Sequence, residues 1–249
     1  MPLPPDSPLG PAPAPTAASA TTAATATTAA TAEVLVLAAH PQLELSRANR
    51  RLIEAATALA PRVQVRDLYA LYPDYLIDVA TEQALLERAT LVVWLHPVHW
   101  YGMPPLMKLW LDDVLTFGWA YGPDGQALRG KDLWLVVSTG GAEESYRPDS
   151  YNRYFFDAFL PPYEQTAALC GMRFLPPLLL HGAHRVGPDE IAAHAQVFSQ
   201  RLAVYPRWDE LALLDDCPTC EVPSTARPAA ESAPAVAAAA ATATATATA

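Results

Sequence analysis

The sequence has few positive charges, and they begin late in the chain. Of 249 residues, 16 are Lys or Arg and 26 are Asp or Glu, and no Lys or Arg precedes Arg47. A secretory signal needs a positive first region and a transit peptide needs arginines, so we expect neither. Residues 33–206 carry 14 basic and 19 acidic side chains. This acidic balance argues against a nucleic-acid partner, because nucleic-acid binding requires a basic surface.

Long apolar runs and cysteine clusters are also missing. No run of large apolar residues approaches the roughly 20 that cross a bilayer, so we expect a cytoplasmic protein. Cys170 lies in an apolar stretch and is expected to be buried. Cys217 and Cys220 form a Cys-Pro-Thr-Cys tetrad without a second pair or a nearby His, so no metal site is predicted. So few cysteines fit a reducing compartment.

The two ends of the chain lack large apolar side chains. Residues 1–32 are almost entirely Ala, Thr and Pro, and the chain ends in an Ala/Thr alternation. Such segments bury too little apolar surface to offset the entropy of ordering the chain. We therefore predict disordered tails at 1–32 and 207–249 around one domain at 33–206.

Within this domain, short apolar runs alternate with segments of helical spacing. Helices are expected from Ser46 onward and at Thr81–Ala89, Pro104–Thr116 and Asp189–Val204. The segment Tyr154–Cys170 is expected to be mostly helical, with Pro161 and Pro162 as the point where a break would fall. Strands are expected at Val34–Ala39, Val63–Leu68, Leu91–Leu95, Leu133–Ser138 and Phe174–Leu180, the last at a sheet edge because of its prolines. The pattern predicts an α/β fold of the flavodoxin-like type, a five-stranded parallel sheet with helices on both faces. Ligands bind such sheets beyond the carboxyl ends of the strands.

The end of the first strand offers an anion site. The sequence has neither GxGxxG nor a Walker motif, so a dinucleotide or ATP bound in those ways is not expected. His40 ends the strand, and Ser46 begins a helix whose free N–H groups suit a phosphate. Asn49 lies one turn further on. The simpler alternative is that Ser46 only caps the helix.

The third and fourth strands end in an aromatic loop and a glycine pair. His99, Trp100 and Tyr101 are suited to wall a flat ring, although packing in the core is the alternative. Thr139, Gly140 and Gly141 let backbone approach a ligand, although many ordinary turns look similar. The three strand ends together are a stronger signal than any one of them.

These motifs resemble a known family. The run HPVHWYGMPPLMKLWLDDVLTFGWAYGPDGQALRGK is similar to the signature of flavodoxin-like NAD(P)H:quinone oxidoreductases, and most similar to the ancillary proteins of glutathione-regulated potassium-efflux systems. DLYALYPDYLIDV and PPYEQTAALCGM resemble the same proteins. The resemblance implies FMN as cofactor, NAD(P)H as co-substrate, a quinone-like acceptor and a homodimer with active sites at its interface. Trp119 and Tyr121, large rings within GWAYGPDGQALRGK, are expected to contribute to that interface.

The resemblance also assigns roles by position. His40, Ser46 and Asn49 would lie at the phosphate and ribityl end of FMN. The isoalloxazine ring would be lined by Pro97, His99, Trp100 and Tyr101, and its pyrimidine side by Thr139, Gly140 and Gly141. Tyr146 matches a tyrosine that lies over the substrate in the animal enzymes. Those enzymes have a histidine six residues later, where this chain has Asn152.

Three alternatives remain open from the sequence. The protein could act mainly as a regulatory subunit of a membrane potassium/proton antiporter, attached peripherally to the inner face of the membrane. It could also be an azoreductase, which differs only in its acceptor. A plain electron-carrying flavodoxin is disfavoured by the GWAYGPDGQALRGK insertion and the Trp-Tyr loop.

Overall fold

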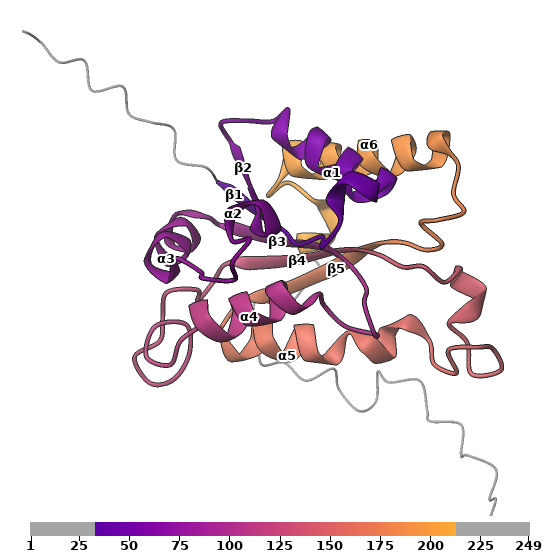
Figure 1. Ribbon diagram of the computed structural model, residues 1–249. Coiled ribbons are helices and arrows are strands. Elements are labelled where there is room, and N and C mark those ends of the chain that lie inside the picture. The colour runs from indigo at the N-terminus through magenta and orange to yellow at the C-terminus, as the bar shows by residue number, and fades with distance from the viewer. Residues whose placement is uncertain (1–32, 213–249) are drawn as a thin grey trace, which may run out of the picture.

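A single parallel sheet organises the chain. The computed structural model describes residues 33–212, so the predicted tail at 1–32 and all but the first residues of the one at 207–249 lie outside the described residues. The strands are β1 (Val34–Ala38), β2 (Val63–Asp67), β3 (Leu91–Pro97), β4 (Asp132–Ser138) and β5 (Arg173–Leu180). They pair in parallel in the order β2-β1-β3-β4-β5 (Figure 1). The predicted fold class is therefore confirmed.

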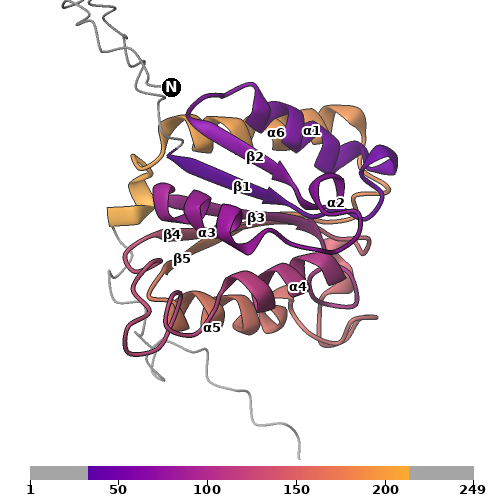
Figure 2. The ribbon, with the colours of Figure 1, turned by 60° about the vertical axis from the view of Figure 1, so that its left-hand side comes forward.

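Helices cover both faces of this sheet, as the two ribbon views show (Figures 1 and 2). Side chains of α1 (Arg47–Thr57) and α6 (Pro188–Val204) pack in one core cluster with alternate residues of the strands. Side chains of α3 (Val79–Arg88), α4 (Pro105–Val114) and α5 (Pro161–Leu169) pack in the other. The central strands β1, β3 and β4 are buried on both faces, which explains their continuous apolar runs.

Strands β2 and β5 lie at the two edges of the sheet, and the edge position was predicted for β5 alone. β5 carries Pro176 and Pro177 and lies at the edge of the sheet, where a missing backbone N–H is tolerated. Its pairing with β4 is irregular between Trp134 and Val136. At the opposite edge, β2 is only partly buried and leads directly into the short helix α2 (Leu68–Leu71), a segment expected to be a loop.

The C-terminal half differs from the expectation in where its elements begin and end. The segment 154–170 is broken next to Pro161, where a break was anticipated, and its α-helical part α5 begins at this proline, at the first helical position. Before it lies only the short 3-10 helix η3 (Phe156–Phe159). The folded part also continues past residue 206: Trp208 and Leu211 are buried in the core beside α6, and η4 spans Asp209–Ala212.

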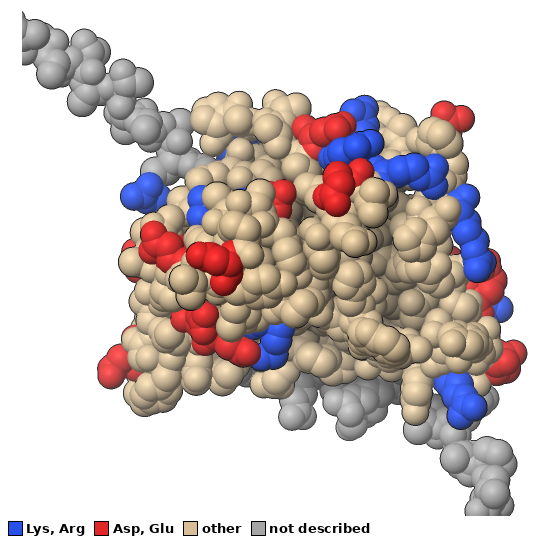
Figure 3. All heavy atoms as spheres, viewed as in Figure 1, with Lys and Arg blue, Asp and Glu red and all other residues tan. Residues whose placement is uncertain are grey.

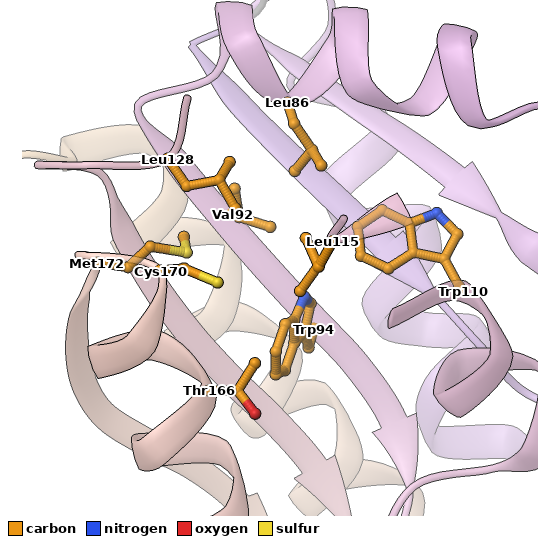
Figure 4. Close-up of a pocket in the computed structure, with 9 residues that line it drawn as sticks. All are labelled: Leu86, Val92, Trp94, Trp110, Leu115, Leu128, Thr166, Cys170 and Met172. Atoms are coloured by element: carbon orange, nitrogen blue, oxygen red, sulfur yellow. The ribbon is translucent and has the colours of Figure 1, made fainter. Parts of the chain in front are cut away.

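A small gap lies in the core on the α4/α5 side of the sheet (Figure 4). It has room for no more than about one water molecule. Apart from Thr166 its lining is apolar, and Cys170 contributes to it, buried as predicted. Burial raises the pKa of the Cys170 thiol to about 11. With Thr166 as its one hydroxyl, the gap is part of the packing and lacks the set of polar groups that orients a ligand.

Charges of both signs are spread over the surface. On the face seen in Figure 3, the central area is mostly uncharged, and most of the Lys and Arg side chains gather toward the upper right edge. Within residues 33–212, no helix is long and apolar enough to cross a membrane.

Candidate active site

The carboxyl ends of four strands meet at one edge of the sheet. The register pairs Ala38 of β1 with Leu95 of β3, and Pro97 of β3 with Ser138 of β4. Ser138 in turn pairs with Leu180 of β5. The loops that follow these strands therefore lie side by side, and the three groups of predicted site residues are brought to the same edge.

The start of α1 is shaped for an anion. Ser46 is the N-cap, and its Oγ accepts a hydrogen bond from the Asn49 N–H at 3.1 Å. The first-turn N–H groups of Arg47 and Ala48 have no intrahelical acceptor, as in every α-helix. Together with the helix dipole they favour a negative group at this position. Ser46 thus does cap the helix, and a role toward a ligand would be added to that.

Asn49 links the first and fourth strand ends. Its side chain is buried, and Nδ2 donates to Ser46 Oγ at 3.2 Å and to Ser138 Oγ at 2.9 Å. The other amide atom, Oδ1, is buried without a hydrogen-bond partner among residues 33–212. An unpaired buried carbonyl oxygen costs stability, and such groups gather where a ligand or water completes the bonding.

The aromatic loop is a tight turn with an unusual backbone. His99 and Gly102 exchange two backbone hydrogen bonds of 3.0 Å, and the residues between them have positive φ angles, 50° at Trp100 and 64° at Tyr101. This conformation normally takes Asn or Gly, so two aromatic residues here are strained. Trp100 is 95% exposed. The turn itself uses neither the Trp100 nor the Tyr101 N–H, which leaves both as donors.

Histidines lie at and behind this loop. Burial, and then the neighbouring His99, lower the pKa of His40, whose Nδ1 accepts from the Gln42 N–H at 3.1 Å. His96 is fully buried at the end of β3, and its burial lowers its pKa to about 4. Its ring stacks on Tyr163 at 5.8 Å between centroids. Pro97 is buried in the strand, so only its backbone or one ring edge is available to a ligand.

The glycine pair is held closely by its neighbours. Thr139 is buried, and its Oγ1 donates to the Gly141 carbonyl at 2.7 Å. A Cβ on Gly141 would lie 2.7 Å from Ser145 Oγ, so a side chain here would force Ser145 to shift. A Cβ on Gly140 would meet nothing nearer than His184, at 3.6 Å. Packing therefore favours glycine at 141, whereas Gly140 has more space beside it.

Tyr146 lies under an aromatic cover beside this turn. It is 7% exposed and packs against Phe156, Phe159 and His181, with centroids 5.3–6.2 Å apart. Burial raises the pKa of its phenol, and the Thr139 side chain opposes that rise. In this arrangement the phenol is not open to solvent.

Asn152 joins the aromatic loop to the glycine loop. The Tyr101 hydroxyl donates to Asn152 Oδ1 at 3.3 Å, and Asn152 Nδ2 donates to Ser145 Oγ at 3.0 Å. Tyr101 also stacks on Phe159 at 5.1 Å. The residue that differs from the animal quinone reductases thus forms a neutral bridge across the mouth of the site.

The fourth loop at this edge, after β5, was not predicted to take part. His181 contacts both Thr139 and Tyr146, and Arg47 of α1 donates to the Val186 carbonyl at 3.0 Å. The sequence did carry a signal, because His181 and Gly182 follow a strand end just as the other site residues do. Among residues 33–212, no three His, Cys, Asp or Glu side chains come together as a metal site.

Comparison with known proteins places this arrangement in a family. A family model of the flavodoxin-like fold matches residues 32–202. The chain belongs to the flavodoxin-like family. It is 46% identical over 178 residues to KefF, a glutathione-regulated potassium-efflux system ancillary protein of Salmonella schwarzengrund (strain CVM19633). That match covers 72% of this chain and 98% of KefF. The resemblance inferred from the sequence is thereby confirmed.

Solved structures share this flavodoxin-like architecture. General stress protein 14 of Treponema denticola, in complex with FMN, is 38% identical, with a TM-score of 0.65 over 69% of this chain and 98% of that one. An NADPH-quinone reductase from P. pentosaceus is 28% identical, with a TM-score of 0.61 over 68% and 97%. A thermophilic tryptophan halogenase from Streptomycin violaceusniger is 41% identical, with a TM-score of 0.65 over 68% and 98%. Names so different show that the fold alone does not fix the reaction.

Proposed function

We propose that the protein is an FMN-dependent NAD(P)H:quinone oxidoreductase. The observation that carries this proposal is the strained turn at Trp100 and Tyr101. It lies at the same sheet edge as the start of α1, whose free N–H groups suit an anion, and as Gly140, which leaves space for a ligand. Relatives support the cofactor and the reaction, since one is described with FMN and another as an NADPH-quinone reductase.

The residues present fit FMN. Its phosphate would take the N–H groups at the start of α1 and the Ser46 hydroxyl. Asn49 Oδ1, buried and without a partner, would accept from a ribityl hydroxyl. His40, which lies close enough to His99 for that ring to lower its pKa, is assigned to this end by the resemblance alone. These groups would form a mononucleotide site, and the sequence has no dinucleotide fingerprint beside them.

The ring would lie between the aromatic turn and the glycine turn. Pro97 and His99 would flank it, and the unused N–H groups of Trp100 and Tyr101 would donate to its polar edge. Thr139, Gly140 and Gly141 would close its pyrimidine side, where Gly140 leaves room for close backbone approach. Bound FMN would take a hydride from NAD(P)H and deliver two electrons to a quinone.

The chain's own part in this reaction is positioning and charge. Backbone donors around the ring would stabilise negative charge that develops there. The exposed Trp100 ring would shield one side of the site from water. Tyr146 would lie over the bound quinone, which requires its aromatic cover of Phe156 and Phe159 to shift. Since Asn152 cannot exchange a proton, we assign it only the bridge from Tyr101 to Ser145.

A visible spectrum of the purified protein, before and after anaerobic NADPH, tests this proposal. A flavin spectrum that bleaches is expected, and cofactor released by heat should chromatograph as FMN. Because donor and acceptor would share one face of the ring, steady-state plots at several quinone concentrations should be parallel. FAD, absence of flavin after reconstitution, or intersecting lines would each contradict the proposal.

A second candidate function follows from the KefF relative, whose name makes it ancillary to potassium efflux. The protein would then bind a membrane antiporter at the inner face of the membrane, with catalysis secondary. A variant that has lost quinone reduction but still raises potassium efflux in cells carrying the antiporter would favour this function. An azoreductase, in turn, would reduce azo dyes faster than quinones.

We also propose that the active protein is a homodimer. Large rings stand exposed around the mouth of the site, and aromatic residues of this kind are enriched at subunit contacts: Trp100, Tyr151, Tyr154 and Phe155. The expected contribution of Trp119 and Tyr121 has less support. Both rings are partly buried against their own core, and Trp119 Nε1 donates to Glu87 at 3.1 Å.

A further inference from the structure

The loop between β5 and α6, residues 181–187, contacts two of the loops assigned to the cofactor without belonging to any predicted motif. Toward the glycine turn it makes three hydrogen bonds. The Gly182 N–H donates to the Gly141 carbonyl at 2.8 Å, and the Ala183 N–H donates to the Thr139 carbonyl at 2.8 Å. The third joins His181 Nδ1 and Thr139 Oγ1, which are 3.1 Å apart.

The direction of the third bond follows from counting protons. Thr139 Oγ1 has one proton, which it donates to the Gly141 carbonyl at 2.7 Å. A carbonyl oxygen only accepts, so the proton is committed there. His181 must then donate from Nδ1–H to a lone pair of Thr139 Oγ1. The Gly141 carbonyl thus accepts from both Thr139 and Gly182, and the chain from His181 to Gly141 fixes the turn.

The same loop is tied to the start of α1. Arg47, the first residue of that helix, donates to the Val186 carbonyl at 3.0 Å, and the His184 carbonyl lies 3.5 Å from the same nitrogen. A small apolar cluster joins the two elements as well, formed by Ala48, Leu180, Ile191, Ala183 and Val186. The loop therefore spans the two structures that would hold the ends of FMN.

We propose that residues 181–187 act as a brace for the cofactor site, with His181 as its positioning residue. By donating to Thr139, His181 holds the Gly140–Gly141 turn in the shape that admits the isoalloxazine ring. It acts through Thr139 and touches neither cofactor nor substrate. This inference rests on the proposed function, because it assumes that the glycine turn faces FMN.

The brace does not depend on the charge of His181. Burial lowers its pKa, while Glu143 and Glu144 raise it, and Tyr146 and Phe156 pack against the ring. Nδ1 carries a proton in the imidazolium and in the neutral tautomer that this geometry selects, so the bond to Thr139 persists in both. FMN affinity due to the brace should therefore stay constant as His181 titrates.

Two substitutions separate the hydrogen bond that His181 donates from the space that its side chain fills. His181→Leu removes the donor, whereas His181→Asn keeps an N–H in the place of Nδ1. We expect His181→Leu to bind FMN about tenfold more weakly, the effect of one net hydrogen bond, and His181→Asn to restore most of that loss. Fluorescence titration of the apoprotein with FMN measures both. His194→Leu is the matched control, since His194 lies on α6 and makes no hydrogen bond to these loops.

The outcomes are distinct. If His181→Leu binds FMN like the wild type, or if His181→Asn is as weak as His181→Leu, the brace is refuted while the proposed function stands. Thermal unfolding of the apoproteins guards against a general loss of structure, and a much lower melting temperature for His181→Leu alone would also count against positioning. If the wild type itself binds no FMN, the proposed function fails first.

Discussion

Ser46 combines a structural role with a proposed ligand role, and one substitution separates them. Ser46→Asp keeps a good N-cap for α1, because Asp accepts from the same N–H groups. It also places a carboxylate against the proposed phosphate. We expect unchanged unfolding but FMN binding at least about tenfold weaker. Ser46→Asn, an equally good cap without charge, is the control, and equal affinities in the two variants would reduce Ser46 to a cap.

His96 should make stability depend on pH. Its pKa falls from 6.5 to about 4 in the folded protein, so the unfolded chain binds more protons between those values. The free energy of unfolding is therefore highest above pH 6.5, where His96 is neutral in both states. It falls by about 3 kcal/mol in all as the pH drops toward 4, because only the unfolded chain takes up the proton.

Chemical unfolding at a series of pH values measures this effect in wild type and His96→Phe. The variant keeps an aromatic ring to stack on Tyr163 and removes the buried Nε2, which has no partner among the described residues. Its free energy of unfolding should fall less steeply below pH 6.5. Parallel pH profiles for the two proteins would show that His96 does not titrate in this way.

At the scale of elements, the strained turn 99–102 allows stability and activity to be changed in opposite directions. Trp100 is 95% exposed with φ 50°, so Trp100→Gly should relieve strain without losing burial. We expect a gain of up to about 1 kcal/mol in stability, but weaker FMN binding and slower quinone reduction. Tyr75→Gly relieves a similar φ of 65° outside the proposed contacts and serves as control. Equal activity in both variants would mean that the Trp100 ring has no role at the site.

Shortening the C-terminal segment shows where the folded domain ends. Trp208 packs against Trp134 at 4.8 Å, and its Nε1 donates to the Arg201 carbonyl at 2.8 Å. A chain ending at residue 206 should lose about 3–5 kcal/mol of stability relative to one ending at 212, the usual cost of removing a buried Trp. Denaturant unfolding of the two truncated proteins gives the comparison. Similar unfolding midpoints for the two proteins would show that the domain ends at residue 206.

The elements show what sequence reasoning reaches and where it stops. The apolar runs of β1, β3 and β4 predict these strands directly, because strands covered on both faces are apolar throughout. The segment 154–160 does not predict its structure in this way, since aromatic residues suit a helix as well as a loop that covers a site. Trp208 was assigned to a tail because its contacts with α6 and β4 are remote in sequence. Such contacts decide structure without leaving a local pattern.

The site divides in the same way. Ser46, the aromatic turn and the glycine pair were found because each follows a strand and has a distinctive composition. His181 was missed because its proposed role depends on a side-chain hydrogen bond to Thr139, which is 42 residues away in the sequence. The bridge from Tyr101 through Asn152 to Ser145 likewise depends on side chains meeting across two loops. Spatial pairing of this kind is supplied by the sheet register, which the sequence only implies.

At the scale of the whole molecule, the exposed rings near the site bear on assembly. Tyr151 is 87% exposed, and Phe155 also projects from the same loop. Monomeric proteins rarely leave such rings clustered in water, and subunit interfaces bury them. We therefore predict a homodimer in which the 151–155 loop lies at the interface. Tyr151→Ser/Phe155→Ser should weaken the dimer, raising the monomer fraction in light scattering and slowing quinone reduction if the partner completes each site.

Trp119 and Tyr121, the pair that the sequence predicts at the interface, give the matched comparison. Trp119→Ala/Tyr121→Ala removes rings that pack on their own core, so it should lower the melting temperature and leave the dimer intact. If this pair dissociates the dimer while Tyr151→Ser/Phe155→Ser does not, the interface lies on the 118–131 segment instead. A wild type that is monomeric and fully active would refute the dimer itself. Because each double variant changes either assembly or folding stability, sedimentation and unfolding measured together assign the rings to one surface or the other.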